Sequence, residues 1–129
     1  MFNKKKKDED IKAFLGKGAE FTGKLIFNGI VRIDGDFNGE IFGGGTLVIG
    51  EGAHVEGDIH VGIILVSGDV YGQIEVKERV EIYPPGKIQG NVITPIFVMQ
   101  EGAIFEGYSR MEASKPDNAF RLQDNSSPE

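Results

Sequence analysis

The stretch LVIGEGAHVEG, residues 47–57, recurs with few changes as FVMQEGAIFEG, residues 97–107. A third stretch, GKGAEFTG at residues 16–23, fits the second half of the same block. Each block closes on an apolar residue, one further residue and a glycine. These closing glycines are Gly23, Gly39, Gly57, Gly72, Gly90 and Gly107, which lie 16, 18, 15, 18 and 17 residues apart. A period of about 17 residues indicates a solenoid of stacked coils.

Each period contains three short runs in which apolar and polar residues alternate, the pattern of half-buried strands. Residues 24–27, 31–33 and 36–38 form one such set, separated by Asn28-Gly29 and Asp34-Gly35. Runs this short would bury almost nothing as hairpins. Three runs joined by glycine corners instead predict a triangular coil, in which each strand pairs with its equivalent one coil away at about 4.8 Å.

The predicted fold is therefore all-β: a parallel β-helix, or triangular β-solenoid, of about six coils over residues 14–110. Right-handed winding is favoured by crossover chirality, while the spacing alone leaves the hand open. Residues 1–13 form a basic N-terminal segment and residues 111–129 a polar C-terminal segment, and both are expected to be disordered tails. The alternation predicts the following side chains to point into the core: Leu25, Phe27, Val31, Ile33, Phe37, Ile41, Leu47, Ile49, Val55, Ile59, Val61, Leu65, Val70, Ile74, Val76, Val80, Ile82, Ile88, Val92, Phe97, Met99 and Phe105.

Composition and charge exclude several classes of protein. The chain has 129 residues, no cysteine and a formal charge of −6, so it has no disulfide framework and no thiolate metal site. Residues 1–7 carry +4 and the remaining residues −10, and an acidic body argues against a nucleic-acid surface. No segment reaches 18 apolar residues, so we expect no membrane-spanning helix, and residues 1–10 lack the apolar core of a signal peptide.

The two ends of the solenoid carry no polar cap in the sequence, so each end would expose apolar side chains and unpaired strand edges. The last coil offers Phe97, Met99, Ile104 and Phe105, and the first coil offers Leu15, Phe21 and Leu25. Ile104 replaces Glu20 and His54 of the matched positions, and Ser109 replaces the apolar residue of the other coils. These ends predict end-to-end self-association; in the alternative interpretation, the tails fold over them.

The chain resembles the bactofilins, bacterial cytoskeletal proteins, over residues 13–110 or so. The resemblance rests on the order and spacing of five stretches: residues 14–18 (FLGKG), 31–35 (VRIDG), 47–59 (LVIGEGAHVEGDI), 80–82 (VEI), and Thr94-Pro95 ahead of EGAIFEG at 101–107. It implies a right-handed triangular β-helix that polymerises without nucleotide, by end-to-end stacking, into non-polar filaments. Such filaments scaffold cell-shape and cell-wall machinery, which makes cell-wall or polarity proteins expected partners. Phe105 matches the C-terminal phenylalanine that the family uses for polymerisation.

The N-terminal segment is the second candidate contact site. Met1-Phe2-Asn3-Lys4 resembles the short membrane-binding segment of the family. Four lysines near an anionic leaflet contribute about 1 kcal/mol each, and a polymer multiplies such weak contacts. We therefore predict a cytoplasmic protein, peripheral on the inner membrane face, that contacts the membrane through six residues: Met1, Phe2, Lys4, Lys5, Lys6 and Lys7.

No pattern in the sequence predicts catalysis or a bound cofactor. Residues 18–25 approach a phosphate-binding loop, but Leu25 stands where a hydroxyl is needed and no helix is expected to follow. His54 and His60 are the only histidines, too few for a three-histidine zinc site. The alternatives to a self-assembling scaffold are a non-polymerising solenoid that binds a partner protein and an acyltransferase of the hexapeptide β-helix type.

Overall fold

The computed structural model describes residues 11–112, with side chains from residue 14 onward. Its elements are all strands: β1 (Ile11–Leu15), β2 (Glu20–Phe27), β3 (Ile30–Ile33), β4 (Asp36–Gly43), β5 (Thr46–Ile49), β6 (His54–Val66), β7 (Asp69–Ile82), β8 (Lys87–Ile93), β9 (Phe97–Met99) and β10 (Ile104–Arg110). Residues 11–112 contain no helix long and apolar enough to cross a membrane. The predicted all-β class is confirmed, and β1 begins three residues before the predicted boundary at residue 14.

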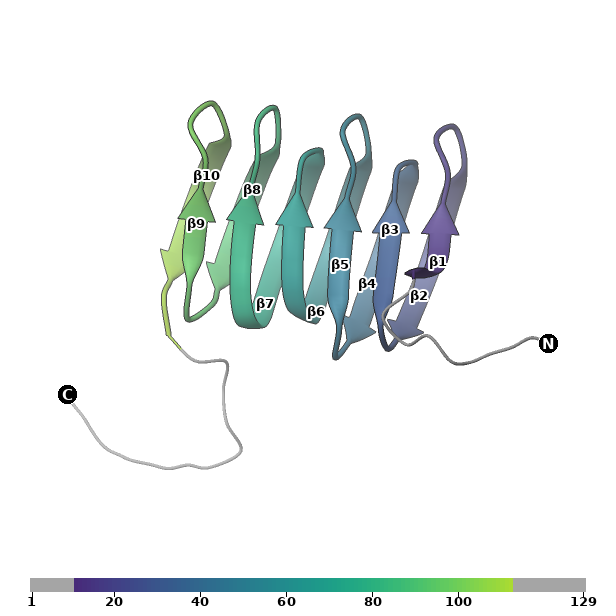
Figure 1. Cartoon of the computed structure of the whole chain (residues 1–129), viewed down its shortest axis with the longest axis horizontal. Coiled ribbons are helices and arrows are strands. Elements are labelled where there is room, and N and C mark those ends of the chain that lie inside the picture. The colour runs from purple at the N-terminus through teal and green to yellow at the C-terminus, as the bar shows by residue number, and fades with distance from the viewer. Residues whose placement is uncertain (1–10, 113–129) are drawn as a thin grey trace.

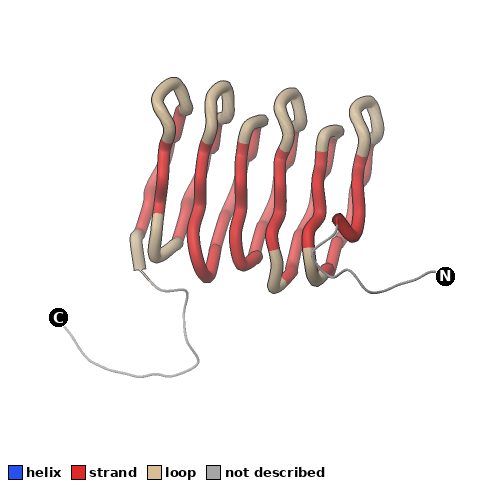
Figure 2. Tube along the Cα trace, viewed as in Figure 1, coloured by secondary structure: helices blue, strands red, loops and turns tan. Residues whose placement is uncertain are grey.

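The strands stack as coils of a parallel β-solenoid, and every strand pair is parallel. In Figure 1 the chain climbs the front strands, crosses the upper loops and descends behind, while it advances from β1 towards β10. This winding is right-handed, as predicted. Figure 2 shows strand along most of each coil, with loops gathered at its turning points.

The repeat glycines form one ladder along the rod. Gly23, Gly39, Gly57, Gly72, Gly90 and Gly107 pair with one another in sequence through neighbouring coils. Each has a positive φ, for example 138° at Gly57, which side-chain-bearing residues rarely adopt. A Cβ on Gly57 would lie 1.7 Å from the carbonyl oxygen of Gly39. The 17-residue signal in the sequence is thus a backbone requirement of this corner.

Each coil has three sides, and the glycine ladder marks the corner between the first side and the second. The first side consists of the residues that precede the ladder glycine in β2, β4, β6, β7, β8 and β10. The second side consists of the residues that follow that glycine in the same strands, up to Phe27, Gly43, Val61, Val76, Ile93 and Arg110. The third side consists of β1, β3, β5, Ile63–Val66 of β6, Arg79–Ile82 of β7, and β9.

The core consists of several columns of stacked apolar side chains, and each coil contributes one side chain to each column. The fully buried members include Ile41, Ile49, Ile59, Ile74 and Ile82. The predicted inward side chains of the central coils are confirmed with one exception. Met99 and Phe105 of the last coil continue core columns but remain partly exposed, because no further coil among residues 11–112 covers them.

Leu65 is the exception, since it was predicted to point inward and instead faces out on the third side. Its neighbours Ile64 and Val66 are fully buried, and Leu65 is half-buried. In the ladder Leu65 pairs with Val48 and Glu81, both outward residues. The run Ile63–Val66 is apolar throughout, so alternation gives no phase there, and the register shifts between Val61 and Ile63.

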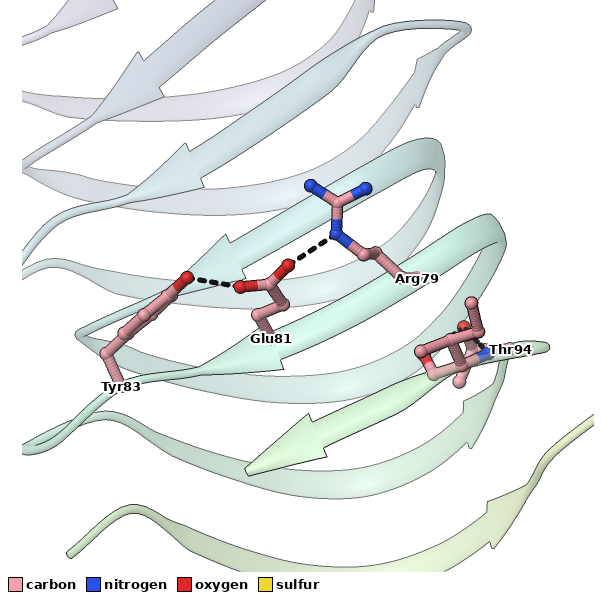
Figure 3. Close-up of polar contacts among 5 residues, drawn as sticks. Arg79, Glu81, Tyr83 and Thr94 are labelled. Carbon is pink, nitrogen blue, oxygen red and sulfur yellow. Dashed lines mark hydrogen bonds and ion pairs between the residues drawn. The ribbon is translucent and has the colours of Figure 1, made fainter. Parts of the chain in front are cut away.

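Thr94 is the one polar residue of the described chain that is buried in the core region. Its hydroxyl donates to the carbonyl oxygen of Ile96 at 2.9 Å (Figure 3). Its own N–H donates to the carbonyl of Arg110 at 3.0 Å. Both bonds satisfy polar groups at the bend between β8 and β9, where Pro95 has no N–H to offer.

Candidate functional site

The two ends of the rod are the sites where the repeat leaves groups uncovered. At one end β1 pairs only with β3, and β2 only with β4. At the other end β9 pairs only with β7, and β10 only with β8. Within residues 11–112, the outer N–H and C=O groups of these four strands therefore face along the rod axis without a neighbouring strand. Such edges are templates for another chain.

The N-terminal end is an apolar hollow. A cavity of about 170 Å³ opens there, and it is lined by Phe14, Leu15, Phe21, Leu25, Val31, Ile33 and Phe37. Phe21 stacks on Phe37 with ring centroids 5.2 Å apart, so its inner face is covered and its outer face is not. Phe14 is 61% exposed and Phe21 41% exposed. The three residues predicted for this end, Leu15, Phe21 and Leu25, all line the cavity.

The C-terminal end is an apolar plateau. Phe97 and Phe105 pack edge to face with centroids 5.1 Å apart, and both rest on the core. Met99 and Ile104 are each 46% exposed. The structure therefore brings all four residues predicted for this end into the last coil, and β9 and β10 position them.

The columns show how the end coil departs from the others. Along the first side, one outward column runs Glu20, Asp36, His54, Asp69, Lys87 and Ile104, so an aliphatic residue replaces charged or polar ones at the end. Along the second side, the inward column of Leu25, Ile41, Ile59, Ile74 and Val92 ends in Ser109. Both departures were predicted from the repeat, and both lie on β10.

The third side carries two clusters of neutralised charge. Arg32 donates to Asp34 at 2.8 and 3.1 Å. Farther along the rod, Glu81 accepts hydrogen bonds from the Tyr83 hydroxyl and from Arg79 (Figure 3). Both hydrogen bonds lower the pKa of the Glu81 carboxyl below its ordinary value, and the bond from Tyr83 has the larger effect. The bond to Glu81 in turn raises the pKa of Tyr83.

The residues weighed for chemistry occupy structural positions. Residues 18–25 lead into strand β2, and Gly23 belongs to the glycine ladder. His54 is exposed on the first side, while His60 stacks on Phe42 and lies 3.5 Å from Glu75. No group of three potential metal ligands occurs among residues 11–112. The two histidines thus occupy the positions of ordinary outward residues in a ladder.

Sequence reasoning missed two features of the surface. Phe14 lines the end cavity, yet it lies in a run predicted only as the start of the repeat. The outer surface of the third side is apolar at its centre, and the four-residue apolar run Ile63–Val66 was the signal that could have shown it, because a half-buried strand needs only alternate apolar residues. The six residues predicted to contact a membrane (Met1, Phe2, Lys4, Lys5, Lys6 and Lys7) lie outside the described residues.

Comparison with known proteins shows which family this chain resembles. Residues 13–110 match the family model described as "Bactofilin: Polymer-forming cytoskeletal". Bactofilin BacP of Myxococcus xanthus is 28% identical over 102 residues, which are 79% of this chain and 42% of BacP, so the chain spans less than half of that relative.

A solved structure is also similar. It is a cryo-EM reconstruction of Thermus thermophilus bactofilin double helical filaments, with a TM-score of 0.65 and 27% identity. The match covers 75% of this chain and 96% of that one. That bactofilin forms double helical filaments. The chain belongs to the bactofilin family of polymer-forming cytoskeletal proteins.

Proposed function

We propose that this protein is a scaffold whose solenoids stack end to end into filaments without nucleotide and without catalysis. The observation that carries the proposal is that core columns run out, uncovered, at both ends of the rod. Leu15 and Met99 are the two ends of one such column, whose four inner members are buried. Stacking covers these side chains and gives the strand edges a partner.

The apolar surface at the ends is large enough to matter. The exposed fractions of Phe14 and Phe21, 61% and 41%, together amount to one whole phenylalanine side chain. Burying one whole phenylalanine side chain contributes about 1.5–3 kcal/mol per protomer. Two N-terminal ends in contact contribute twice that, about 3–6 kcal/mol, which offsets part of an association cost of roughly 4–15 kcal/mol. Strand pairing adds to this gain.

Like ends are proposed to meet, which gives non-polar filaments. If the solenoid continued head to tail in register, Ser109 would sit on Leu25, and Ile104 on Glu20. Both contacts pair an apolar side chain with a polar one. Contacts of N-terminal with N-terminal ends, and of C-terminal with C-terminal ends, avoid that mismatch.

We also propose how the filaments are arranged and where in the cell they lie. The Thermus thermophilus relative forms double helical filaments, and we propose that two filaments of this chain also pair side by side. We further propose that residues 1–7 bind them to the inner face of the cytoplasmic membrane, where they position cell-shape or cell-wall proteins. Met1 and Phe2 with Lys4–Lys7 support this step, since each weak contact is multiplied along a polymer.

Sedimentation of the purified chain tests the proposal. At physiological salt the protein is expected to pellet at high speed to the same extent with no nucleotide, with Mg-ATP and with Mg-GTP. Pelleting that requires a nucleotide would contradict the nucleotide-independent mechanism. Protein that stays in the supernatant at all concentrations would instead favour a solenoid that binds a partner protein without polymerising.

A further inference from the structure

The outer surface of the third side is more apolar than a solvated strand face needs to be. Its outward side chains form two rows across the coils: Phe14, Arg32, Val48, Leu65, Glu81 and Val98 in one, and Ile30, Thr46, Ile63 and Arg79 in the other. Val48, Ile63 and Leu65 occupy the centre and are all half-buried. We call this surface the lateral face; β3, β5 and β9 lie at the front of Figure 1.

The lateral face is also neutral, whereas the first side is acidic. Among the side chains that the structure describes, its charged residues are Arg32 with Asp34, and Arg79 with Glu81. The first side carries five carboxylates (Glu20, Asp36, Glu56, Asp69 and Glu106) against Lys87. The second side has polar residues at its centre, including Asp58, Gln73 and Glu75. An interface core is depleted of charge, so only the lateral face suits close approach of another acidic rod.

The order of residues in one row is self-complementary. Along the rod axis this row runs from a cation (Arg32) through two apolar residues (Val48 and Leu65) to an anion (Glu81). A second copy turned end for end, about a two-fold axis parallel to the strands, places Leu65 on Val48 and Glu81 on Arg32. Such an isologous contact satisfies both halves at once.

From this complementarity, we propose that the lateral face joins two filaments of this chain, and that its occupant is the antiparallel lateral face of a second copy. The inference rests on the proposed function, because it needs filaments to pair. In the pair, Arg32 and Glu81 of facing protomers extend the ion pairs that each already makes within its own chain, and the apolar centre is covered.

The size of the face explains why pairing would depend on the polymer. Six strands at about 4.8 Å and four residues at about 3.3 Å give roughly 29 by 13 Å, or about 380 Å² per protomer. A stable two-protein contact buries about 800 Å² per partner. One protomer therefore contributes too little to dimerise alone, and repetition along a filament supplies the rest.

The first test is Leu65→Glu, compared with Tyr71→Glu as a matched control. Leu65 on β6 faces out, so the variant keeps its core, and Tyr71 is an exposed residue of the first side on the next strand, β7. In negative-stain electron micrographs, wild type and Tyr71→Glu are expected to show paired filaments, and Leu65→Glu single filaments of half the width. Paired filaments of Leu65→Glu would overturn the assignment of the face.

The second test reverses charges. Arg32→Glu is expected to separate the pairs, and Arg32→Glu combined with Glu81→Arg to restore them. Within one chain the two residues lie three coils apart, about 14 Å, which exceeds the screening length of about 8 Å at physiological salt. Rescue therefore reports a contact between copies. A double variant that stays single would refute the antiparallel register.

The outcomes separate this inference from the proposed function. If wild-type protein forms no filament, the proposed function fails. If wild type forms filaments that are only single, polymerisation stands and the lateral contact is refuted. If Leu65→Glu keeps its paired filaments but no longer sediments with vesicles of anionic phospholipid, the face binds membrane instead, which also refutes the contact between copies.

Discussion

Replacing Phe105 with arginine should block one end of the solenoid and leave the other intact. Phe105 packs edge to face on Phe97 and is half-buried in the free protomer. Its uncovered part is the surface that a second C-terminal end would bury. Because like ends meet in the proposed filament, every C-terminal contact contains this residue twice, and the substitution counts twice.

The expected effect is large. Burying a whole phenylalanine side chain contributes about 1.5–3 kcal/mol, so the uncovered parts of two such rings account for at most about 1–2 kcal/mol per contact. Two guanidinium groups would be buried in their place, and each unpaired buried charge costs several kcal/mol more. The lost burial and the two buried charges together cost more than about 6 kcal/mol, which lowers the association constant of the C-terminal contact by roughly four orders of magnitude.

The assay is sedimentation velocity combined with electron microscopy. Phe105→Arg is expected to form dimers joined through their N-terminal ends, with unchanged β-rich circular dichroism. Tyr71→Arg, an aromatic-to-arginine change on the first side of the rod, is the control and should form filaments. Filaments of normal length from Phe105→Arg would refute the placement of this residue at a contact. Monomers would refute like-with-like pairing, because a head-to-tail filament blocked at one end has no contact left.

Three further predictions concern the membrane, the corner and the ion pairs. Deletion of residues 1–7 should abolish co-sedimentation with anionic liposomes and leave polymer pelleting unchanged; unchanged liposome binding would contradict the anchor. Gly57→Ala should cost at least about 3 kcal/mol in thermal unfolding, because its Cβ would lie 1.7 Å from a carbonyl oxygen, whereas Gly52→Ala, with no atom within 4 Å, should cost about 1 kcal/mol. Equal losses would contradict the corner argument. Because the pKa of Glu81 is lowered in the folded protein, its ionised carboxylate stabilises the fold at pH values above 4.5, its ordinary pKa. This stabilisation is lost as the pH falls through the lowered pKa. Glu81→Gln should therefore have a lower melting temperature than wild type at pH 7, and the two curves should converge in acid; parallel curves would contradict it.

Much of the fold could be predicted because the repeat is a physical requirement at each coil. The spacing of the closing glycines reports a corner that has no room for a Cβ, so it predicted the period and the register together. The end residues followed from the same alignment, since Ile104 and Ser109 stand out against their columns. Phe97, Met99 and Phe105 then had to lie in the last coil.

Other features could not be read from the sequence. Alternation fails as a signal where every residue is apolar, so the phase at Leu65 was wrong and the lateral face went unseen. The cavity beside Phe14 depends on how β1 crosses the end of the core, which no spacing encodes. The ion-pair network of Arg79, Glu81 and Tyr83 depends on rotamers that bring alternate residues together along one strand edge.

The axial repeat of the filament, measured by electron microscopy of purified wild-type protein, tests the central claim most directly. Six coils at about 4.8 Å give roughly 29 Å per protomer. End-to-end stacking of like ends makes the repeating unit two protomers, so the account predicts filaments without added nucleotide and an axial repeat of about 58 Å. Dispersed particles at physiological salt, or a filament whose axial repeat is unrelated to the length of the rod, would contradict it.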